Sequence, residues 1–435
     1  MSRAPAHGGQ GRWLLAILFL AYMFAYLDRQ VVGLLTPALK ADLHLSDVQV
    51  SLLQGLAFAG FYAVVGLPLG ELVDRASRRT VLALGIAGWS LATIACGLAH
   101  DFWPLFIARL GVGIGEACLA PAAVSLAADA FAPDRRGRAM GVMQAGTPIG
   151  SALSLLVGGA VLSLFAPHGL LAGRAPGGLA PWQMVFLTIG APGLVVALMA
   201  ARLREPARLE PPRERGAGLR QVLAAAPLTF LLFYATYSLV FVVGYGTSAW
   251  GPTILMRIYG ASPGKAGLIF AGLLLASSPL AGVAGGVLSD ALARRRPGDG
   301  RMLIPALLLP AVIAALAGFL AAHSLWSTVA WLGLALFFTN LIATTSFAAL
   351  QELAPNRLRG KAVALYLLIG NLVGLGGAPT LVALVTDRVL HDEMRLQTSV
   401  GLVALGAAVA ALALALLLPR RYRAARIARP ALAPA

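Results

Sequence analysis

Two groups of ionisable residues interrupt stretches of this chain that are otherwise apolar and long enough to cross a membrane. Asp28 and Arg29 fall inside the first such stretch, and Arg109 and Glu116 fall inside the fourth. A charge at bilayer depth costs about 3 kcal/mol or more unless it is paired or faces a wet cavity, so such residues usually belong to a transport pathway or a proton relay. The chemistry that this set can perform is exchange of a proton at a carboxylate, controlled by a neighbouring guanidinium.

The spacing of these residues predicts that they lie within reach of one another. At about 1.5 Å per residue, Asp28 and Arg109 lie at the same depth, roughly 10 Å inside one membrane surface. Glu116 follows on nearly the same helix face as Arg109, roughly 10 Å deeper. Arg109 could then turn toward Asp28 or toward Glu116, which would let Glu116 take up or release a proton. A fixed ion-pair network that holds spans one and four together explains the same residues.

The composition is that of an all-α membrane protein. Hydrophobic residues make up 59% of the 435 positions and charged residues 12%, whereas soluble domains carry roughly 25% charged residues. Charge-free windows and the two interrupted stretches together predict twelve membrane spans, two of them within 302–351. The stretches are 13–35, 48–70, 80–100, 103–128, 139–173, 175–201, 221–256, 266–289, 302–351, 362–386 and 396–419.

The net charge of +16 indicates membrane topology and argues against nucleic-acid binding. If the N-terminus is cytoplasmic and the spans alternate, 26 of the 34 Lys and Arg residues lie in cytoplasmic segments and six in outside loops. This asymmetry places both termini in the cytoplasm. The first apolar run shows no cleavable signal-peptide pattern. Cys96 and Cys118 both fall inside predicted spans, which argues against a disulfide framework and against a metal site.

The chain divides into two halves that echo each other. The segment Gly70–Arg79 after span two is echoed by Gly286–Arg295 after span eight, and Phe131–Ala139 after span four by Leu353–Ala362 after span ten. Two matches in the same order at a nearly constant offset predict an internal repeat. The predicted divisions are a cytoplasmic N-terminus at 1–12, a six-helix bundle at 13–201, a cytoplasmic linker at 202–223, a second six-helix bundle at 224–418 and a cytoplasmic C-terminus at 419–435.

The loop at Gly70–Arg79 reads Gly-x3-Asp-Arg-x2-Arg-Arg and resembles the signature loop of the major facilitator superfamily, with Ser77 where that signature usually has Gly. Within the superfamily, the chain most resembles the spinster group of lipid transporters. The resemblance implies two six-helix bundles with a substrate site between them near the membrane midplane. It also supports a role for Asp28, Arg29, Arg109 and Glu116 in proton coupling. The matching stretches are Tyr26–Arg29, Arg109-x3-Gly113-x-Gly115-Glu116-Ala117, Pro121–Ala123 and Phe131–Ala139.

The charges of the Gly70–Arg79 loop have a separate predicted role. Carboxylate–guanidinium pairs at this end of span two could latch the two bundles together on the cytoplasmic side. The resemblance to the superfamily favours this latch over the alternative that the arginines only set topology. The predicted gate residues are Glu71, Asp74, Arg75, Arg78 and Arg79.

Aromatic and polar side chains recur at helical spacing in spans seven and ten. Such stripes are more often packing surfaces than binding surfaces, but the resemblance implies that these spans line the substrate cavity, where the rings would face the acyl chain of an amphiphile. Glycine and proline in spans five and eleven favour close helix packing. The candidate cavity residues are Tyr234, Tyr237, Phe241, Tyr245, Phe337, Asn340 and Thr344.

Three functions are consistent with a chain of this kind. The first is a proton-coupled secondary transporter that moves a lipid-like or amphiphilic solute, of lysophospholipid or sphingoid type, by alternating access. The second is a transporter of the same fold for small organic anions or drugs, since organic-anion symporters also carry Leu-Asp-Arg in span one. The third, a membrane enzyme acting on lipids, lacks a catalytic motif, because no HExxH, GxSxG or P-loop pattern is present. We expect a monomeric bacterial inner-membrane transporter that is driven by the proton gradient without a cofactor, with membrane lipids, protons and an amphiphilic substrate as partners.

Overall fold

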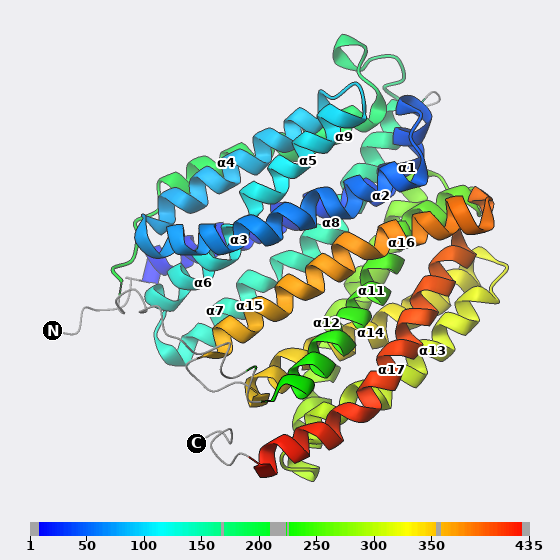
Figure 1. Cartoon of the computed structure of the whole chain (residues 1–435). Helices are drawn as coiled ribbons and strands as arrows, with labels where there is room; N and C mark the ends of the chain where they lie inside the picture. Colours follow the sequence, from blue (N-terminus) through cyan, green and yellow to red (C-terminus); the bar gives the residue numbers. More distant parts are fainter. Residues whose placement is uncertain (1–7, 167–168, 209–222, 224–225, 354–357, 429–435) are drawn as a thin grey trace. The chain divides into compact units, whose positions relative to one another are not determined.

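The chain is all-helical in the part that the structure describes. A computed structural model describes residues 8–166, 169–208, 223, 226–353 and 358–428. Within these residues, twelve helical stretches are long and apolar enough to cross a membrane, which confirms the predicted all-α fold (Figure 1). Parts of the predicted termini and linker, and residues 354–357 of the repeated loop, lie outside the described residues.

The first six spans occupy the N-terminal half of the chain. Span two contains a short α-helix, a π-helical turn and a longer α-helix, and spans four and five are each built from two helices. The elements are α1 (Gly8–Leu43), α2 (Asp47–Ser51), η1 (Leu52–Leu56), α3 (Ala57–Arg75), α4 (Arg78–Gly97), α5 (Phe102–Glu116), α6 (Leu119–Ala130), α7 (Pro133–Gln144), α8 (Gly146–Phe165), η2 (Pro176–Gly178) and α9 (Pro181–Ala201).

The other six spans follow in the C-terminal half. Span eleven carries two π-helical turns, η5 and η6, between and after its α-helices. The elements are α11 (Pro227–Arg257), α12 (Pro263–Arg295), η3 (Gly300–Leu303), α13 (Ile304–Leu320), α14 (Leu325–Leu353), α15 (Arg359–Gly370), η5 (Asn371–Gly377), α16 (Ala378–Leu384), η6 (Val385–Leu390), η7 (Glu393–Arg395) and α17 (Leu396–Ala428).

Local sequence explains where many of these helices begin. Proline opens α7, α9 and α11, where its missing N–H costs nothing because the first N–H groups of a helix have no intrahelical partner. Asp101 caps α5 by accepting a hydrogen bond from the backbone N–H of Trp103, and Ser77 caps α4 in the same way from Thr80. α1 continues to Leu43, beyond the end that the charge pattern predicts for span one.

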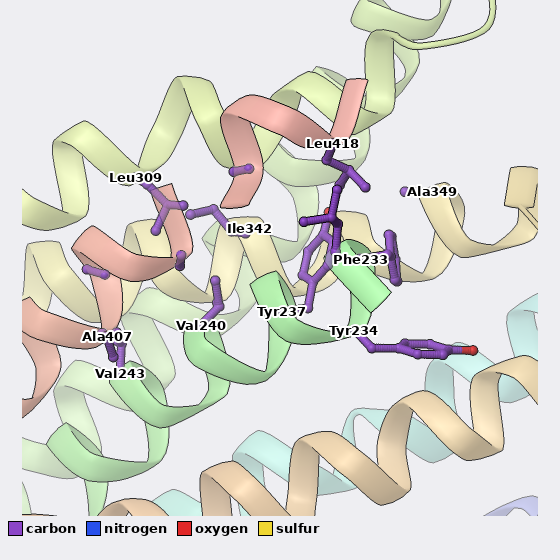
Figure 2. Close-up of a cluster of buried hydrophobic side chains, with 14 of the residues drawn as sticks. Phe233, Tyr234, Tyr237, Val240, Val243, Leu309, Ile342, Ala349, Ala407 and Leu418 are labelled. Atoms are coloured by element: carbon purple, nitrogen blue, oxygen red, sulfur yellow. The ribbon is translucent and has the colours of Figure 1, made fainter. Parts of the chain in front are cut away.

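The chain forms two compact units. Unit 1 comprises Met1–Glu214 with Gly260–Leu274, so the beginning of α12 belongs to it, and unit 2 comprises Arg215–Tyr259 with Leu275–Ala435. In unit 1, α1 packs along α8, and α4 packs along α9 and α5. In unit 2, α11 packs along α17, and α13 packs against both α14 and α17. The core of unit 2 is a cluster of apolar side chains around Phe233, Tyr237 and Ile342 (Figure 2).

Candidate functional site

The four predicted ionisable residues lie close together in unit 1. Asp28 and Arg29 come from α1, and Arg109 and Glu116 come from α5. Asp28, Arg109 and Glu116 are at most 2% exposed, whereas the Arg29 side chain is 13% exposed. Three of the four are therefore fully enclosed by the bundle, and Arg29 alone keeps some contact with the outside of it.

Glu116 is paired with Arg29. Nε and Nη2 of Arg29 both donate to Oε2 of Glu116, at 2.8 and 2.5 Å. The other oxygen, Oε1, has no hydrogen-bond partner among the described residues. The sequence predicts that Arg109 can turn toward either Asp28 or Glu116, because Arg109 and Glu116 lie on one face of the same helix. In the structure the cation bound to Glu116 is instead Arg29, whose long side chain reaches Glu116 from α1.

Three aromatic rings surround the guanidinium of Arg29. Its central carbon lies 4.6 Å from the ring centre of Tyr26, 4.3 Å from that of Phe58 and 5.4 Å from that of Tyr62. Phe58 and Tyr62 are themselves stacked, with their centres 5.5 Å apart. A cation over an aromatic face gains roughly 0.5–2 kcal/mol depending on its solvation. The rings of Tyr26, Phe58 and Tyr62 thus form an aromatic cage around Arg29. The sequence did not predict this cage, although Phe58 and Tyr62 lie one helical turn apart.

Arg109 is held by backbone carbonyls instead of carboxylates. Its Nε donates to the carbonyl of Leu53 at 3.3 Å, and its Nη1 donates to the carbonyl of Asp28 at 3.4 Å. Leu53 lies in the π-helical turn η1, which interrupts span two at the level of Arg109. Nη2 of Arg109 has no hydrogen-bond partner among the described residues. Arg109 is therefore a fixed buried cation close to Asp28, which agrees with the predicted common depth of the two residues.

The carboxylate of Asp28 faces a third helix. Its Oδ2 accepts a hydrogen bond of 2.5 Å from the hydroxyl of Thr93 in α4, and its Oδ1 has no partner among the described residues. Consecutive residues of an α-helix point about 100° apart, so Asp28 and Arg29 face different neighbours. Asp28 faces α4, whereas Arg29 faces α5 and the rings of span two.

Glycines in α5 let the neighbouring spans approach this site. A Cβ on Gly113 would lie 2.7 Å from the carbonyl oxygen of Phe58, and one on Gly115 would lie 2.7 Å from the backbone nitrogen of Trp89. Real Cβ atoms essentially never come that close, so both positions need glycine for the helices to pack at this distance. The Gly-x-Gly-Glu motif thus combines two close contacts with a buried acid.

Each buried carboxylate in the site has one bonded oxygen and one without a partner. An ionised carboxylate only accepts hydrogen bonds, whereas a protonated carboxyl group also donates one. The two cations differ in kind, since Arg29 is partly exposed and bound to a carboxylate, whereas Arg109 is enclosed and bound to carbonyls. Among the described residues no three His, Cys, Asp or Glu side chains cluster as a metal site requires.

The predicted gate residue Arg78 binds partners within unit 1. Its side chain is 1% exposed, forms ion pairs with Asp129 and Glu205, and donates to the hydroxyl and carbonyl oxygens of Ser125. Ser77 donates to the second oxygen of Glu205 at 2.5 Å. These contacts connect the start of α4 to the end of α6 and to the segment after α9. They hold the loop to its own unit.

Partial burial acts to raise the pKa of the Glu205 carboxyl. The hydrogen bonds from Ser77 and Arg78, together with the charge of Arg78, outweigh that effect, so the pKa lies below its ordinary value. The Glu205 carboxylate is therefore an ionised partner for Arg78.

The remaining predicted gate residues are more exposed. Arg208 donates to the backbone carbonyls of Val73, Asp74 and Ala76, and so caps the end of α3. The Asp74 side chain is exposed and forms no ion pair with a described residue. Glu71 and Arg75 are both exposed and lie 3.9 Å apart, and Arg79 donates to the carbonyl of Leu203 at 3.1 Å.

Unit 2 repeats the Arg78 arrangement with Arg301 at its centre. Nη1 of Arg301 donates to Glu352 at 2.5 Å, Nη2 to Asp290 at 3.1 Å, and Nε to the Ser289 hydroxyl at 3.0 Å. Glu352 lies at the end of span ten, as Asp129 lies at the end of span four. The sequence echo matched Arg78 with Arg294, but Arg301 makes the equivalent bonds because the loop after span eight is longer.

The candidate cavity residues of span seven surround a tyrosine from span eleven. The ring centre of Tyr366 lies 6.5 Å from Tyr234, 6.1 Å from Tyr237 and 5.4 Å from Phe241. Tyr237 is 0% exposed and points into the core of unit 2 (Figure 2), so it is a packing residue there and not a cavity residue as predicted. Tyr234 is also buried, and its hydroxyl donates to the carbonyl of Ala362 at 3.3 Å.

The other candidates keep some exposure. Phe241, Tyr245, Phe337 and Asn340 are half-buried, and Thr344 is exposed. The Tyr245 hydroxyl donates to the side-chain oxygen of Asn371 at 3.2 Å, whereas the Thr344 hydroxyl bonds to carbonyls of its own helix. These five positions remain candidates. Tyr366 belongs to span eleven, so the periodicity of span seven could not identify it as a neighbour of the span-seven rings.

Comparison with known proteins supports the same family. The Major Facilitator Superfamily model matches residues 18–378. An "MFS-type efflux pump" of Mycolicibacterium smegmatis is 29% identical over 406 residues, covering 89% of this chain and 88% of that protein. "Protein spinster homolog 1" of Xenopus tropicalis is 27% identical over 404 residues, covering 86% of this chain and 73% of that protein.

A solved structure of a spinster homolog shares the fold of this chain. The crystal structure of a bacterial homolog of the human lysosomal transporter Spinster, inward-facing and unoccupied, is 26% identical, with a TM-score of 0.77 over 98% of this chain and 99% of that chain. The chain therefore belongs to the Major Facilitator Superfamily, as a twelve-helix, multi-pass membrane transporter that is related to the spinster proteins and is not an enzyme.

Proposed function

We propose that the chain is a proton-coupled secondary transporter of a lipid-like, amphiphilic solute of the lysophospholipid type. The observation that carries the proposal is the Arg29–Glu116 pair. Glu116 is fully buried, and within the described residues Arg29 is the side chain hydrogen-bonded to its carboxylate. Arg29 itself is partly exposed, so a solute in the pathway can approach the cation without entering the bundle.

Proton coupling follows from the cost of leaving a buried carboxylate unpaired. If the Arg29 guanidinium moves away, Glu116 must either remain charged in an apolar interior or take a proton. An isolated buried charge is so costly that such groups neutralise instead. Release of Arg29 and protonation of Glu116 are therefore coupled, and the proton gradient can drive the exchange. Arg109 does not need to move in this scheme, because backbone carbonyls hold it in place.

The aromatic cage supports an amphiphilic anion as the solute. A phosphate or carboxylate head group can compete with Glu116 for the Arg29 guanidinium, since arginine binds both anions through paired N–H groups. The rings of Tyr26, Phe58 and Tyr62 then offer apolar surface next to the head group. The relation to the spinster proteins favours a lipid over a small sugar acid.

We further propose that the transporter lies in the bacterial cytoplasmic membrane as a monomer, with both termini in the cytoplasm and no cofactor. The excess of Lys and Arg in alternate loops supports this orientation. The proton gradient across that membrane then supplies the driving force.

Reconstituted transport tests the proposal. Protein in liposomes is given radiolabelled lysophosphatidylglycerol, with and without an imposed pH gradient, and Glu116→Gln is compared with the unsubstituted protein. We expect the gradient to increase lysolipid transport several-fold in the unsubstituted protein and to have no effect on Glu116→Gln. Equal stimulation of both proteins would contradict coupling at Glu116, and no lysolipid transport in either would contradict the substrate class.

A second candidate function is transport of small organic anions or drugs. The similarity to the efflux pump of Mycolicibacterium smegmatis, which extends over most of both chains, favours it. The same liposomes distinguish the two candidates when lysophosphatidylglycerol is replaced by a small organic anion or by a drug. Gradient-driven movement of either compound without movement of lysolipid would select the second function.

A further inference from the structure

The hydroxyl of Thr93 has two acceptors within reach but only one proton. Its Oγ1 lies 2.5 Å from Oδ2 of Asp28 and 2.9 Å from the backbone carbonyl oxygen of Trp89. A threonine hydroxyl donates one hydrogen bond and has lone pairs that accept others. The proton on Thr93 can therefore point toward Asp28 or toward Trp89, but not toward both.

The two directions correspond to two protonation states of Asp28. When the Asp28 carboxylate is ionised it can only accept, so Thr93 must donate to Oδ2. When Oδ2 carries a proton, its O–H donates to Oγ1 of Thr93, and the Thr93 proton turns to the Trp89 carbonyl. The Asp28–Thr93 hydrogen bond survives in both states with donor and acceptor exchanged. The proton on Asp28 comes from water, and the O–H bond of Thr93 is not broken.

We infer that Thr93 is a positioning residue for proton exchange at Asp28, because its hydroxyl reverses between Trp89 and Asp28 and so satisfies both states of the acid. The inference rests on the proposed proton coupling and adds Asp28 to Glu116 as a proton-carrying group. Thr93 is 0% exposed, so bulk water cannot replace its hydroxyl directly. Oδ1 of Asp28 has no partner among the described residues, which makes Thr93 the side chain that controls the acid's hydrogen bonding.

Other charged and titratable groups face Asp28 from the packed helices. Arg109 contributes a cation from α5, in contact with the backbone carbonyl of Asp28. Glu116 of α5, Cys96 of α4 and the adjacent Arg29 also interact with Asp28 electrostatically. These groups change the charge around the acid, but none of them forms a hydrogen bond with its carboxylate among the described residues. The reversing hydrogen bond is specific to Thr93.

Infrared difference spectroscopy tests this inference without a transported solute. The full-length protein in lipid nanodiscs is titrated with acid, and the C=O stretching band of protonated Asp28 is identified by its loss in Asp28→Asn. In Thr93→Val, which keeps the shape of the side chain but removes the hydroxyl, we expect this band to move to higher frequency. Thr93→Ser should restore its position. The matched control is Ser90→Ala, because Ser90 is a buried hydroxyl residue of the same helix that does not bond to Asp28.

The outcomes separate this inference from the proposed function. A band that Asp28→Asn removes but Thr93→Val leaves unchanged would overturn the role of Thr93 and leave proton exchange at Asp28 intact. A spectrum without any band that Asp28→Asn removes would overturn protonation of Asp28 itself. Loss of proton coupling altogether is measured separately, by the transport of Glu116→Gln. If Thr93→Val does not fold, Thr93→Ser still has to retain the band of the unsubstituted protein for the inference to stand.

Discussion

Arg301 in unit 2 corresponds to Arg78 in unit 1. Each forms an ion pair with an acidic side chain 51 residues further along the chain. In both units the arginine lies at the start of one span and the acid at the end of the next span. The two units differ in a further ion pair near this loop. In unit 1, Arg78 also binds the acid Glu205 after span six. In unit 2, the acid Asp299 binds Arg423 near the end of span twelve.

Removing the two arginines should cost different amounts of stability. Arg78→Ala leaves Asp129 and Glu205 without their buried cation, and breaking such a pair costs about 3 kcal/mol. Arg301→Ala should cost about 1 kcal/mol, because Arg301 is 22% exposed and water can solvate its partners. Thermal unfolding of both variants in detergent measures the difference. Equal losses would contradict the role of burial.

The pair of Arg29 and Glu116 should show strong coupling in a double-mutant cycle. Arg29→Met leaves a buried carboxylate unpaired and should lower the stability by about 3 kcal/mol, whereas adding Glu116→Gln removes that charge and should recover most of the loss. Unfolding temperatures of the two single variants and the double variant measure the coupling. Losses that simply add would mean that the two side chains act independently.

Protonation of Glu205 should make the protein less stable in acid. Its pKa is lower in the folded protein than the ordinary value of 4.5, so its contribution is complete above that value and is lost as the pH falls through the folded-state pKa. Glu205→Gln should therefore lose less stability than the unsubstituted protein between about pH 5 and pH 3. Unfolding temperatures across that range test the sign, and parallel curves would contradict it.

The glycine contacts in α5 predict a position-specific cost. Gly113→Ala places a methyl group against the Phe58 backbone, which cannot move away as a flexible side chain would, so a loss of about 1–3 kcal/mol is expected. Gly88→Ala is the matched control in α4, because no atom lies within 4 Å of its added Cβ. Similar unfolding temperatures for the two variants would show that α5 can shift to make room.

The fold could be predicted from the sequence because the spans follow from hydrophobicity and length alone. The charge-free windows and the two charge-interrupted stretches together locate all twelve spans, and the positions of Asp28 and Arg109 show that both belong to one level of the bundle. These conclusions need only the helical rise and the cost of burying charge.

The partners within the site could not be predicted in the same way. Helical spacing put Glu116 on the face of Arg109, but it could not show that Arg29 extends across from α1 to reach it. The contact between Asp28 and Thr93 depends on how α1 and α4 pack, which one sequence does not reveal. The backbone bonds of Arg109 depend on a π-helical turn, for which no sequence signal was recognised.

That π-helical turn, Leu52–Leu56, has a consequence for comparing this protein with its relatives. Its hydrogen bonds span five residues instead of four, as in the bond from Ala57 to Leu52, so span two contains one residue more than a regular helix of the same length. Residues on the N-terminal side are thereby rotated by about 100° from the face that α-helical counting assigns to them. Aligning this span with a relative whose second helix is regular requires a one-residue gap inside the hydrophobic stretch.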